Sequence, residues 1–432
     1  MCAMPRLHLL LALCSISLSF ATHGQAVLNG QDTSYRVITT AVPFLTISPD
    51  ARAAAMGDAG AATTPDANAT YWNAAKLVFA PRDRGVSLSY SPWLRRLVGG
   101  MSLAYVSAYS KIDDKQAVAL SMNYFNLGDL SLKDNTGLSA GDFKPREFAA
   151  AATYARKLSG VFSLAATVRY IYSDVYGTLN TNSAIASQAG QAVSGDLGAY
   201  FRTYTEQADF PVRLAFGAVL SNIGTKMNYG GGQRNYLPAS LRVGSQMSFV
   251  VGAGQFNFAL DLSKWLVPTP PVYETIDGQV RRNPDGNPLV RYGKDPNRSY
   301  LGAMFGSFGD APGGFSEEMR EVMVSAGGEY VFNNLLMFRL GYFYESPEKG
   351  GREYFSAGAG ARLGVVGLDL AYLIPTQQNH PLGETIRFSV NLDTGEKFVD
   401  KARKVTRQTH QQRNPNRKQR APQYRNRQLR RR

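Results

Sequence analysis

The segment Ile386-Arg387-Phe388-Ser389-Val390-Asn391-Leu392-Asp393 places an apolar residue at every second position and a polar residue between each pair. Alternation with a period of two is the pattern of a β-strand whose two faces meet different surroundings. The alternation recurs from residue 85 to residue 393, in about fourteen segments of roughly 8–13 residues, a length that suits strands crossing a bilayer. Segments 162–170 and 256–263 are further clear examples. The pattern predicts a large antiparallel β protein.

The polar face of these segments distinguishes a membrane barrel from a soluble sandwich. It carries mainly Gly, Ala, Ser and Asn, as in Ser356, Gly358 and Gly360, rather than the many Lys and Glu of a water-facing sheet. Small residues suit a crowded lumen, and the alternating apolar face suits lipid. Open strand edges cannot be satisfied in lipid, so membrane strands must close. We expect an all-β fold, a transmembrane antiparallel β-barrel of about 14 strands over 85–394, with a soluble β protein as the alternative.

Residues 1–26 have the three parts of a secretory signal peptide. Arg6 is followed by an apolar run from Leu7 to Phe20 and by small residues that end at Ala26. The only two cysteines, Cys2 and Cys14, lie in this segment. The mature chain should therefore hold no disulfide, no Cys-ligated metal and no Cys nucleophile.

The basic character of the chain is a property of its C-terminal tail. Segment 401–432 holds 13 Lys or Arg and no acid, out of a net charge of +14 for all 432 residues. We expect 395–432 to be a disordered tail without a nucleic-acid role, either idle or bound to an anionic periplasmic partner. The candidate binding residues of the tail are Arg413, Arg417, Lys418, Arg420, Arg430, Arg431 and Arg432.

The segment 27–84 does not alternate and is a candidate plug. An Ala-rich helical turn is expected after a Ser48 cap, and a second short helix is expected over 71–77. The candidate plug residues are Asp50, Arg52, Met56, Gly57, Asp58, Asp66, Tyr71, Trp72 and Asn73. Local capping and packing is the alternative role for them.

Three stretches carry a resemblance to a known family. They are Ala41 to Asn73, with Met56-Gly57-Asp58-Ala59-Gly60 at its centre, Asp310 to Glu318, and Leu340 to Gly360. Together they resemble the PorV/PorQ family of outer-membrane barrels, which are similar to the FadL fatty-acid channel. The resemblance covers about residues 40–393, although Ala74 stands where the family commonly has Pro.

The resemblance implies a fourteen-stranded component of the type IX secretion system in the outer membrane of a Gram-negative cell. Such proteins bind the C-terminal signal domains of cargo at a giant translocon. They carry the cargo to a surface attachment complex that contains the sortase PorU with PorQ and PorZ. The tail would lie in the periplasm, and outer-membrane lipid would surround the barrel.

Long connections at about 126–145, 174–192, 223–237 and 265–321 alternate with tight turns. Loops this long are usually functional or disordered. In the longest one, Ser316 followed by Glu317 and Glu318 could start a short helix. We expect partner contact from the residues just before it, Asp310, Pro312, Gly313, Gly314 and Phe315.

Catalytic chemistry finds little support in the sequence. Only His380 and His410 follow the leader, and no HExxH, GxSxG or CxxC occurs. We expect no catalytic, cofactor-binding or metal-binding residues and no enzyme activity. Two alternatives stay open, a FadL-like conduit for hydrophobic small molecules and a lipopolysaccharide deacylase. A conduit needs an apolar lumen, whereas Arg169, Asp261, Asp369 and Arg387 are expected to face inward.

Overall fold

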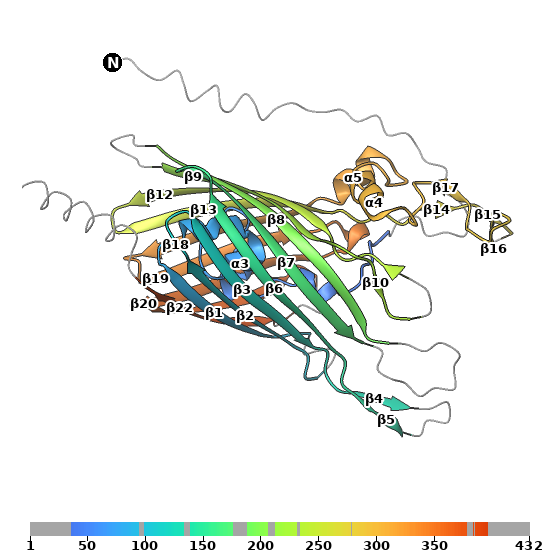
Figure 1. Cartoon of the computed structure of the whole chain (residues 1–432), viewed down its shortest axis with the longest axis horizontal. Coiled ribbons are helices and arrows are strands. Elements are labelled where there is room, and N and C mark those ends of the chain that lie inside the picture. Colours follow the sequence, from blue (N-terminus) through green and yellow to red (C-terminus); the bar gives the residue numbers. More distant parts are fainter. Residues whose placement is uncertain are drawn as a thin grey trace, which may run out of the picture.

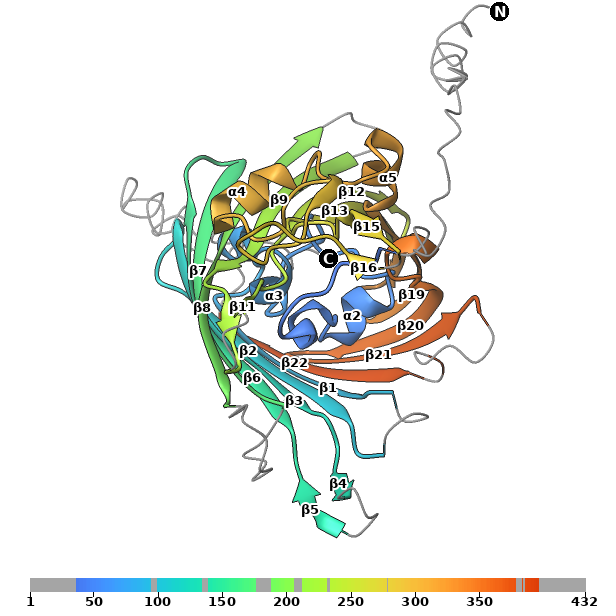
Figure 2. The same ribbon diagram turned by 90° about the vertical axis from the view of Figure 1, so that its right-hand side faces the viewer.

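The computed structural model describes residues 36–94, 99–133, 139–175, 188–205, 212–230, 234–277, 279–377, 383 and 385–395. Fourteen of its strands form one closed antiparallel barrel, which confirms the predicted fold class (Figures 1 and 2). The first strand pairs with the last, with Ser89 opposite Ser389, so the barrel has no free edge. The barrel strands are β1 Arg84–Pro92, β2 Ser102–Lys111, β3 Gln116–Asn126, β6 Arg146–Lys157, β7 Phe162–Asp174, β8 Gly190–Thr205, β9 Val212–Gly224, β12 Ser240–Val251, β13 Gly254–Trp265, β18 Met323–Phe332, β19 Leu336–Tyr344, β20 Glu353–Leu363, β21 Val366–Pro375 and β22 Ile386–Thr394.

The two faces of each strand divide as the alternation predicts. In β1, Leu88 and Tyr90 are exposed on the outer wall, whereas Ser87 and Ser89 are buried in the lumen. The same division holds in β22, where Arg387 is fully buried. Apolar side chains therefore face the surroundings, and polar or small ones face an enclosed interior.

Short turns gather at one end of the barrel and long connections at the other. The connections β12–β13, β18–β19 and β20–β21 are tight, and we call this the short-turn end. At the opposite, long-loop end lie the hairpins β4–β5, β10–β11, β14–β17 and β15–β16 and the helices α4, α5 and η4 (Figure 1). Their bounds are β4 Leu130–Lys133, β5 Ser139–Phe143, β10 Met227–Asn228, β11 Arg234–Asn235, β14 Val272–Tyr273, β15 Thr275–Ile276, β16 Gln279–Val280, β17 Val290–Tyr292, α4 Tyr300–Gly306, α5 Phe315–Arg320 and η4 Pro347–Lys349.

A chain segment of short helices lies inside the barrel (Figure 2). It contains η2 Pro43–Thr46, α2 Ala51–Ala54, α3 Ala69–Trp72 and η3 Ala74–Phe79. Leu77 and Phe79 pack in a cluster with small wall residues such as Ala117, Ala155 and Ala165. Small wall residues leave room for the inner segment, so wall and plug share one core. None of the helices among the described residues is long and apolar enough to cross a membrane.

Two details of the expected plug helices are wrong. The first turn is capped by Asp50 and not by Ser48, because the Asp50 carboxylate accepts the Ala53 backbone N–H at 2.9 Å. The second helix does not run unbroken over 71–77. It ends at Asn73, whose extended backbone separates α3 from η3.

Candidate functional site

The plug lies so close to the wall that several strands have room only for glycine. A Cβ added at Gly341 would lie 2.0 Å from the Gly57 nitrogen, and one added at Gly217 would lie 2.2 Å from the Ala61 oxygen. Contacts this short between backbones leave no side chain free to yield. The wall glycines that meet the plug backbone in this way are Gly217, Gly327 and Gly341, whereas a Cβ added at Gly198, Gly244 or Gly358 would meet side-chain atoms of the plug.

Arg52 of the plug is the centre of a buried charge network. Its guanidinium donates to both oxygens of Glu329 in β18, at 3.1 and 3.0 Å, and to Asp66 at 2.8 Å. Planar guanidinium and carboxylate groups match in such two-bond pairs, which fix direction as well as distance. The plug is therefore attached to the wall by a directional ion pair.

The same network continues around the wall from Glu329. Arg339 in β19 donates to Glu329 at 2.7 Å and to Asp369 in β21 at 2.6 Å. Asn391 in β22 then donates to the second oxygen of Asp369 at 2.7 Å. Four of the five consecutive strands from β18 to β22, all except β20, thus share one polar network with the plug.

Asp50 joins the two helical parts of the plug. One carboxylate oxygen caps α2, and the other accepts the indole N–H of Trp72 at 2.6 Å. The Trp72 ring covers Gly60 so closely that an added Cβ would lie 2.2 Å from the ring. Burial raises the pKa of Asp50 to about 6, with the charge of Asp66 acting in the same direction.

Met56, Gly57 and Asp58 form the turn that follows α2. Gly57 and Asp58 both have a left-handed backbone, with φ of 64° and 61°. A Cβ at Gly57 would also lie 2.4 Å from the Tyr342 backbone oxygen, so both the backbone conformation and this close contact require glycine. Asp58 accepts the Tyr354 hydroxyl at 2.6 Å, and Met56 is buried beside Gly327.

Asn73 and Tyr71 satisfy backbone groups that the short helices leave open. The Asn73 amide donates to Ala61 within the plug and to Ala199 in β8, both at 2.9 Å. The Tyr71 hydroxyl lies within hydrogen-bond distance of the Leu45 and Ile47 carbonyl oxygens. All nine candidate plug residues therefore take part in holding the segment together or in fitting it to the wall.

A second polar cluster lies at the long-loop end, around α5. Glu317 accepts from Lys349 at 2.6 Å and from Arg36 at 2.5 Å, and Glu321 accepts from Lys349 at 2.9 Å. Lys264 of β13 forms ion pairs with Glu318 and Glu321. This α5 clamp joins the long loop, the barrel wall and the start of the described chain.

Hydrogen bonds to the Glu317 carboxylate oppose the effect of burial on its pKa. Burial alone would raise its pKa, but donation from Lys349, the Gly313 N–H and Arg36 holds the pKa below its ordinary value. The carboxylate form is the one that fits the clamp.

The candidate partner-contact residues divide between buried and exposed positions. Asp310 is buried and pairs with Arg298 at 2.6 Å, while its backbone N–H donates to Glu318 at 2.8 Å. Pro312 and Gly313 are half-buried, Gly314 is exposed, and Phe315 is 71% exposed. Asp310 therefore stabilises the loop, whereas the Phe315 side chain is exposed on its surface.

Sequence reasoning did not identify α4 as a candidate element. Its start has the expected signal, because the Ser299 hydroxyl accepts the Gly302 N–H at 3.3 Å as an N-cap. The α4–α5 segment, residues 299–321, exposes five large apolar side chains along its length. They are Leu301, Phe305, Phe308, Phe315 and Met319.

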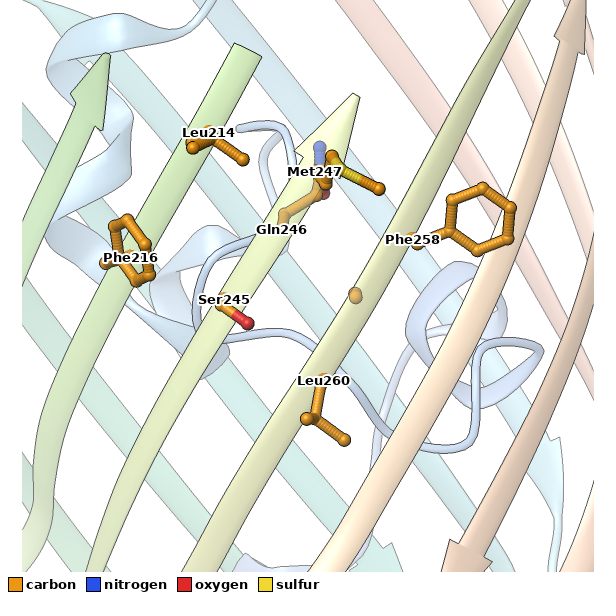
Figure 3. Close-up of a pocket in the computed structure, with 8 residues that line it drawn as sticks. Leu214, Phe216, Ser245, Gln246, Met247, Phe258 and Leu260 are labelled. Atoms are coloured by element: carbon orange, nitrogen blue, oxygen red, sulfur yellow. The ribbon is translucent and has the colours of Figure 1, made fainter. Parts of the chain in front are cut away.

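A hollow of about 270 Å³ lies on the outer wall rather than in the lumen (Figure 3). Its floor includes Ser245 in β12, and its sides are large apolar residues from β9, β12 and β13, among them Phe216, Met247 and Phe258. The hollow arises because a small residue faces outward between large ones. The hollow therefore belongs to the outward-facing apolar surface of the barrel.

The comparison with protein families identifies one match. The family model described as "Type IX secretion system protein PorV" matches residues 29–272. No curated protein matches the chain significantly.

Solved barrels resemble the chain at low identity. The toluene transporter TbuX of Ralstonia pickettii is 14% identical, with a TM-score of 0.42, over 79% of this chain and 96% of that chain. The CymD monoaromatic hydrocarbon channel is 13% identical, with a TM-score of 0.45, over 81% of this chain and 98% of that one.

Proposed function

The chain belongs to the PorV family of type IX secretion system outer-membrane proteins, and from this premise we propose that it receives secreted cargo through the α4–α5 segment. In this proposal it binds the C-terminal signal domains of cargo at the translocon. It then carries them to the surface attachment complex that contains PorU, PorQ and PorZ.

The observation that carries this proposal is a set of exposed apolar side chains on a firmly held loop. Phe305 in α4 and Phe315 in α5 are 70% and 71% exposed, although Glu317 in α5 and Glu321 just after it are buried and paired. Exposed aromatic residues on a rigid support are typical anchors of protein interfaces. Long loops of outer-membrane barrels face the cell exterior, where cargo emerges.

The filled lumen supports docking rather than passage. Backbone contacts at Gly217 and Gly341 and the Arg52–Glu329 ion pair would all have to break before a solute could pass the plug. The lumen wall next to the plug also holds buried charged residues, among them Asp261, Arg339 and Asp369. Both features disfavour a conduit for hydrophobic molecules.

The plug motif in this proposal has a structural role, and the tail acts elsewhere. The last strand, β22, ends at Thr394 on the short-turn side, which is the periplasmic side of such barrels. The tail 395–432 would then start in the periplasm and could meet an anionic partner there. Its basic residues lie outside the described part of the chain.

A test replaces displayed apolar side chains and asks what co-purifies. We expect Phe305→Ser with Phe315→Ser to reduce recovery of the translocon barrel and of cargo signal domains from solubilised outer membranes. Ile276→Ser is the matched control, because Ile276 is 59% exposed on the separate β15–β16 hairpin. Unchanged recovery with a correctly folded double variant would contradict the proposal.

A further inference from the structure

Three neighbouring short turns carry no charged residue. The stretches 250–256, 331–337 and 363–367 join β12–β13, β18–β19 and β20–β21, and none contains Asp, Glu, Lys or Arg. Exposed apolar side chains lie at or beside their tips, with Val251 at 48%, Leu335 at 40% and Val365 at 46%, and the exposed pair Asn333 and Asn334 forms the tip of the β18–β19 turn. Turns of a barrel usually meet water and are polar, so these three need a different neighbour.

The opposite side of the same end is charged. The start of β1 carries Arg84, the β2–β3 turn carries Lys115 with Asp113 and Asp114, and the end of β6 carries Arg156. Arg84 and Arg156 both point outward. Long cationic side chains in this position extend toward lipid headgroups.

Several backbone groups of these turns form hydrogen bonds with neighbouring strands or turns. The Asn333 N–H donates to the Ala253 oxygen at 3.0 Å, which links the β18–β19 turn to the β12–β13 turn. The Arg362 N–H donates to Leu335 at 2.8 Å, and the Asp393 N–H donates to Val365 at 2.8 Å. Each unpaired polar group placed in hydrocarbon would cost several kcal/mol, and these bonds reduce that cost.

The apolar outer wall also runs into these turns without a break. Phe249 and Phe256 stack with ring centres 5.5 Å apart, and Phe256 lies 4.7 Å from Tyr330. Phe332, 6.5 Å from Tyr330, brings the row to the tip of the β18–β19 turn. On the other flank, Met247 and Phe258 continue the row into the hollow of Figure 3.

We propose that the barrel sits tilted in the membrane, with lipid hydrocarbon covering the β12–β13, β18–β19 and β20–β21 turns. The charged ends of β1–β3 and β6 then lie among the headgroups or beyond them. Burying apolar surface is worth about 25 cal/mol per Å², so the uncharged side of the barrel sinks until its turns leave water. This surface lies at the end opposite the α4–α5 segment and does not depend on cargo binding.

Site-directed spin labelling tests the proposal in a bilayer that contains no other protein. Single cysteines Val251→Cys, Leu335→Cys and Val365→Cys are placed in a background with Cys2→Ser and Cys14→Ser. Lys115→Cys in the charged β2–β3 turn is the control, because residue 115 is exposed there. Each labelled protein is reconstituted in phosphatidylethanolamine–phosphatidylglycerol vesicles, and collision with oxygen is compared with collision with a water-soluble nickel chelate.

Tilted insertion predicts a nickel collision rate several-fold lower at the three uncharged turns than at residue 115, with a higher oxygen rate. Equal nickel rates at all four positions would overturn the proposal and would leave a protein partner as the cover for these turns. Conservative Val→Cys changes at two sites keep the test valid if Leu335→Cys does not fold.

Discussion

The plug and the α4–α5 segment are both attached to the barrel through buried ion pairs, yet they present opposite surfaces. The plug buries nearly all its side chains, from Ala51 to Ala80, and meets the wall backbone directly. The α4–α5 segment buries its acids and exposes its large apolar residues. The plug thus fills space, whereas the loop holds an apolar surface out to solvent.

The difference lies in which residues make the contact between the barrel and each segment. Glycines such as Gly327 and Gly341 let the plug approach at backbone distance, so shape fixes its position. Lys264 and Lys349 hold α5 through charge at the ends of long side chains. Backbone contacts allow almost no movement, whereas contacts made by flexible side chains allow some, which agrees with the partner binding that we propose for this loop.

The largest effect is expected from a side chain placed between plug and wall. Gly341→Val would put its Cβ 2.0 Å from the Gly57 nitrogen, and neither backbone can yield. Overpacking of this kind costs about 3 kcal/mol or more, so we expect a displaced plug or loss of the folded barrel. Heat-modifiable electrophoretic mobility measures the folded fraction. Gly160→Val, in open space, should behave as the native chain does.

Removing the Arg52 guanidinium should have the next largest effect. Arg52→Ala leaves Asp66 without its ion pair and Glu329 with Arg339 alone. Breaking a buried pair by removing one partner costs about 3–5 kcal/mol. The midpoint of urea unfolding in lipid vesicles should fall accordingly. Lys144→Ala, which removes an exposed pair with Asp129, should leave the midpoint nearly unchanged.

A smaller and local effect is expected at the α5 clamp. Lys349→Ala removes one of two cations from Glu317 and one of two from Glu321. Because each acid keeps a partner, we expect about 2 kcal/mol of local destabilisation, seen as faster proteolysis within 299–321. Barrel stability should not change. A lower unfolding midpoint of the whole barrel would show that loop and barrel are not separate units.

The smallest expected effect is a loss of α5-clamp stability at low pH. The pKa of Glu317 is lower in the folded protein than its ordinary value, so its contribution is present above the unfolded pKa and is lost as pH falls through the folded pKa. We expect proteolysis of the α4–α5 segment to quicken as pH falls below about 4.3, the usual value for Glu. Glu317→Gln should weaken this dependence. A native rate that is constant down to about pH 3 would contradict the role given to Glu317.

The barrel could be predicted from the sequence because alternation reports burial directly. Segments such as 386–393 show both faces in one short run, and the strand pattern matches throughout the described chain. The position of the plug in the sequence could be predicted, but its internal contacts could not. The Asp50 cap and the break at Asn73 depend on Trp72 and Ala199, which are distant partners that no local pattern reveals.

The long loop was the least predictable region. Phe315 stood out beside its glycines, but α4 has only six residues after its Ser299 cap before Gly306, too few for a clear period. The role of the wall glycines was equally hard to predict, because a glycine in a strand does not indicate which segment packs against it. Both features arise from contacts between segments that lie far apart in the sequence.

The central claim is that the plug stays in place while the loop does the binding. Gly198→Cys with Ala75→Cys tests it most directly, since a Cβ at residue 198 would lie 3.7 Å from the Ala75 Cβ, a distance that suits a disulfide. The one shorter contact of that Cβ, 2.7 Å to the Asn73 Oδ1, is with the end of a side chain and not with backbone. In a background without Cys2 and Cys14, we predict that the oxidised protein recovers as much translocon and cargo as the reduced protein or the Gly198→Cys single variant. Loss of cargo on oxidation, with recovery on reduction, would show that the plug has to move.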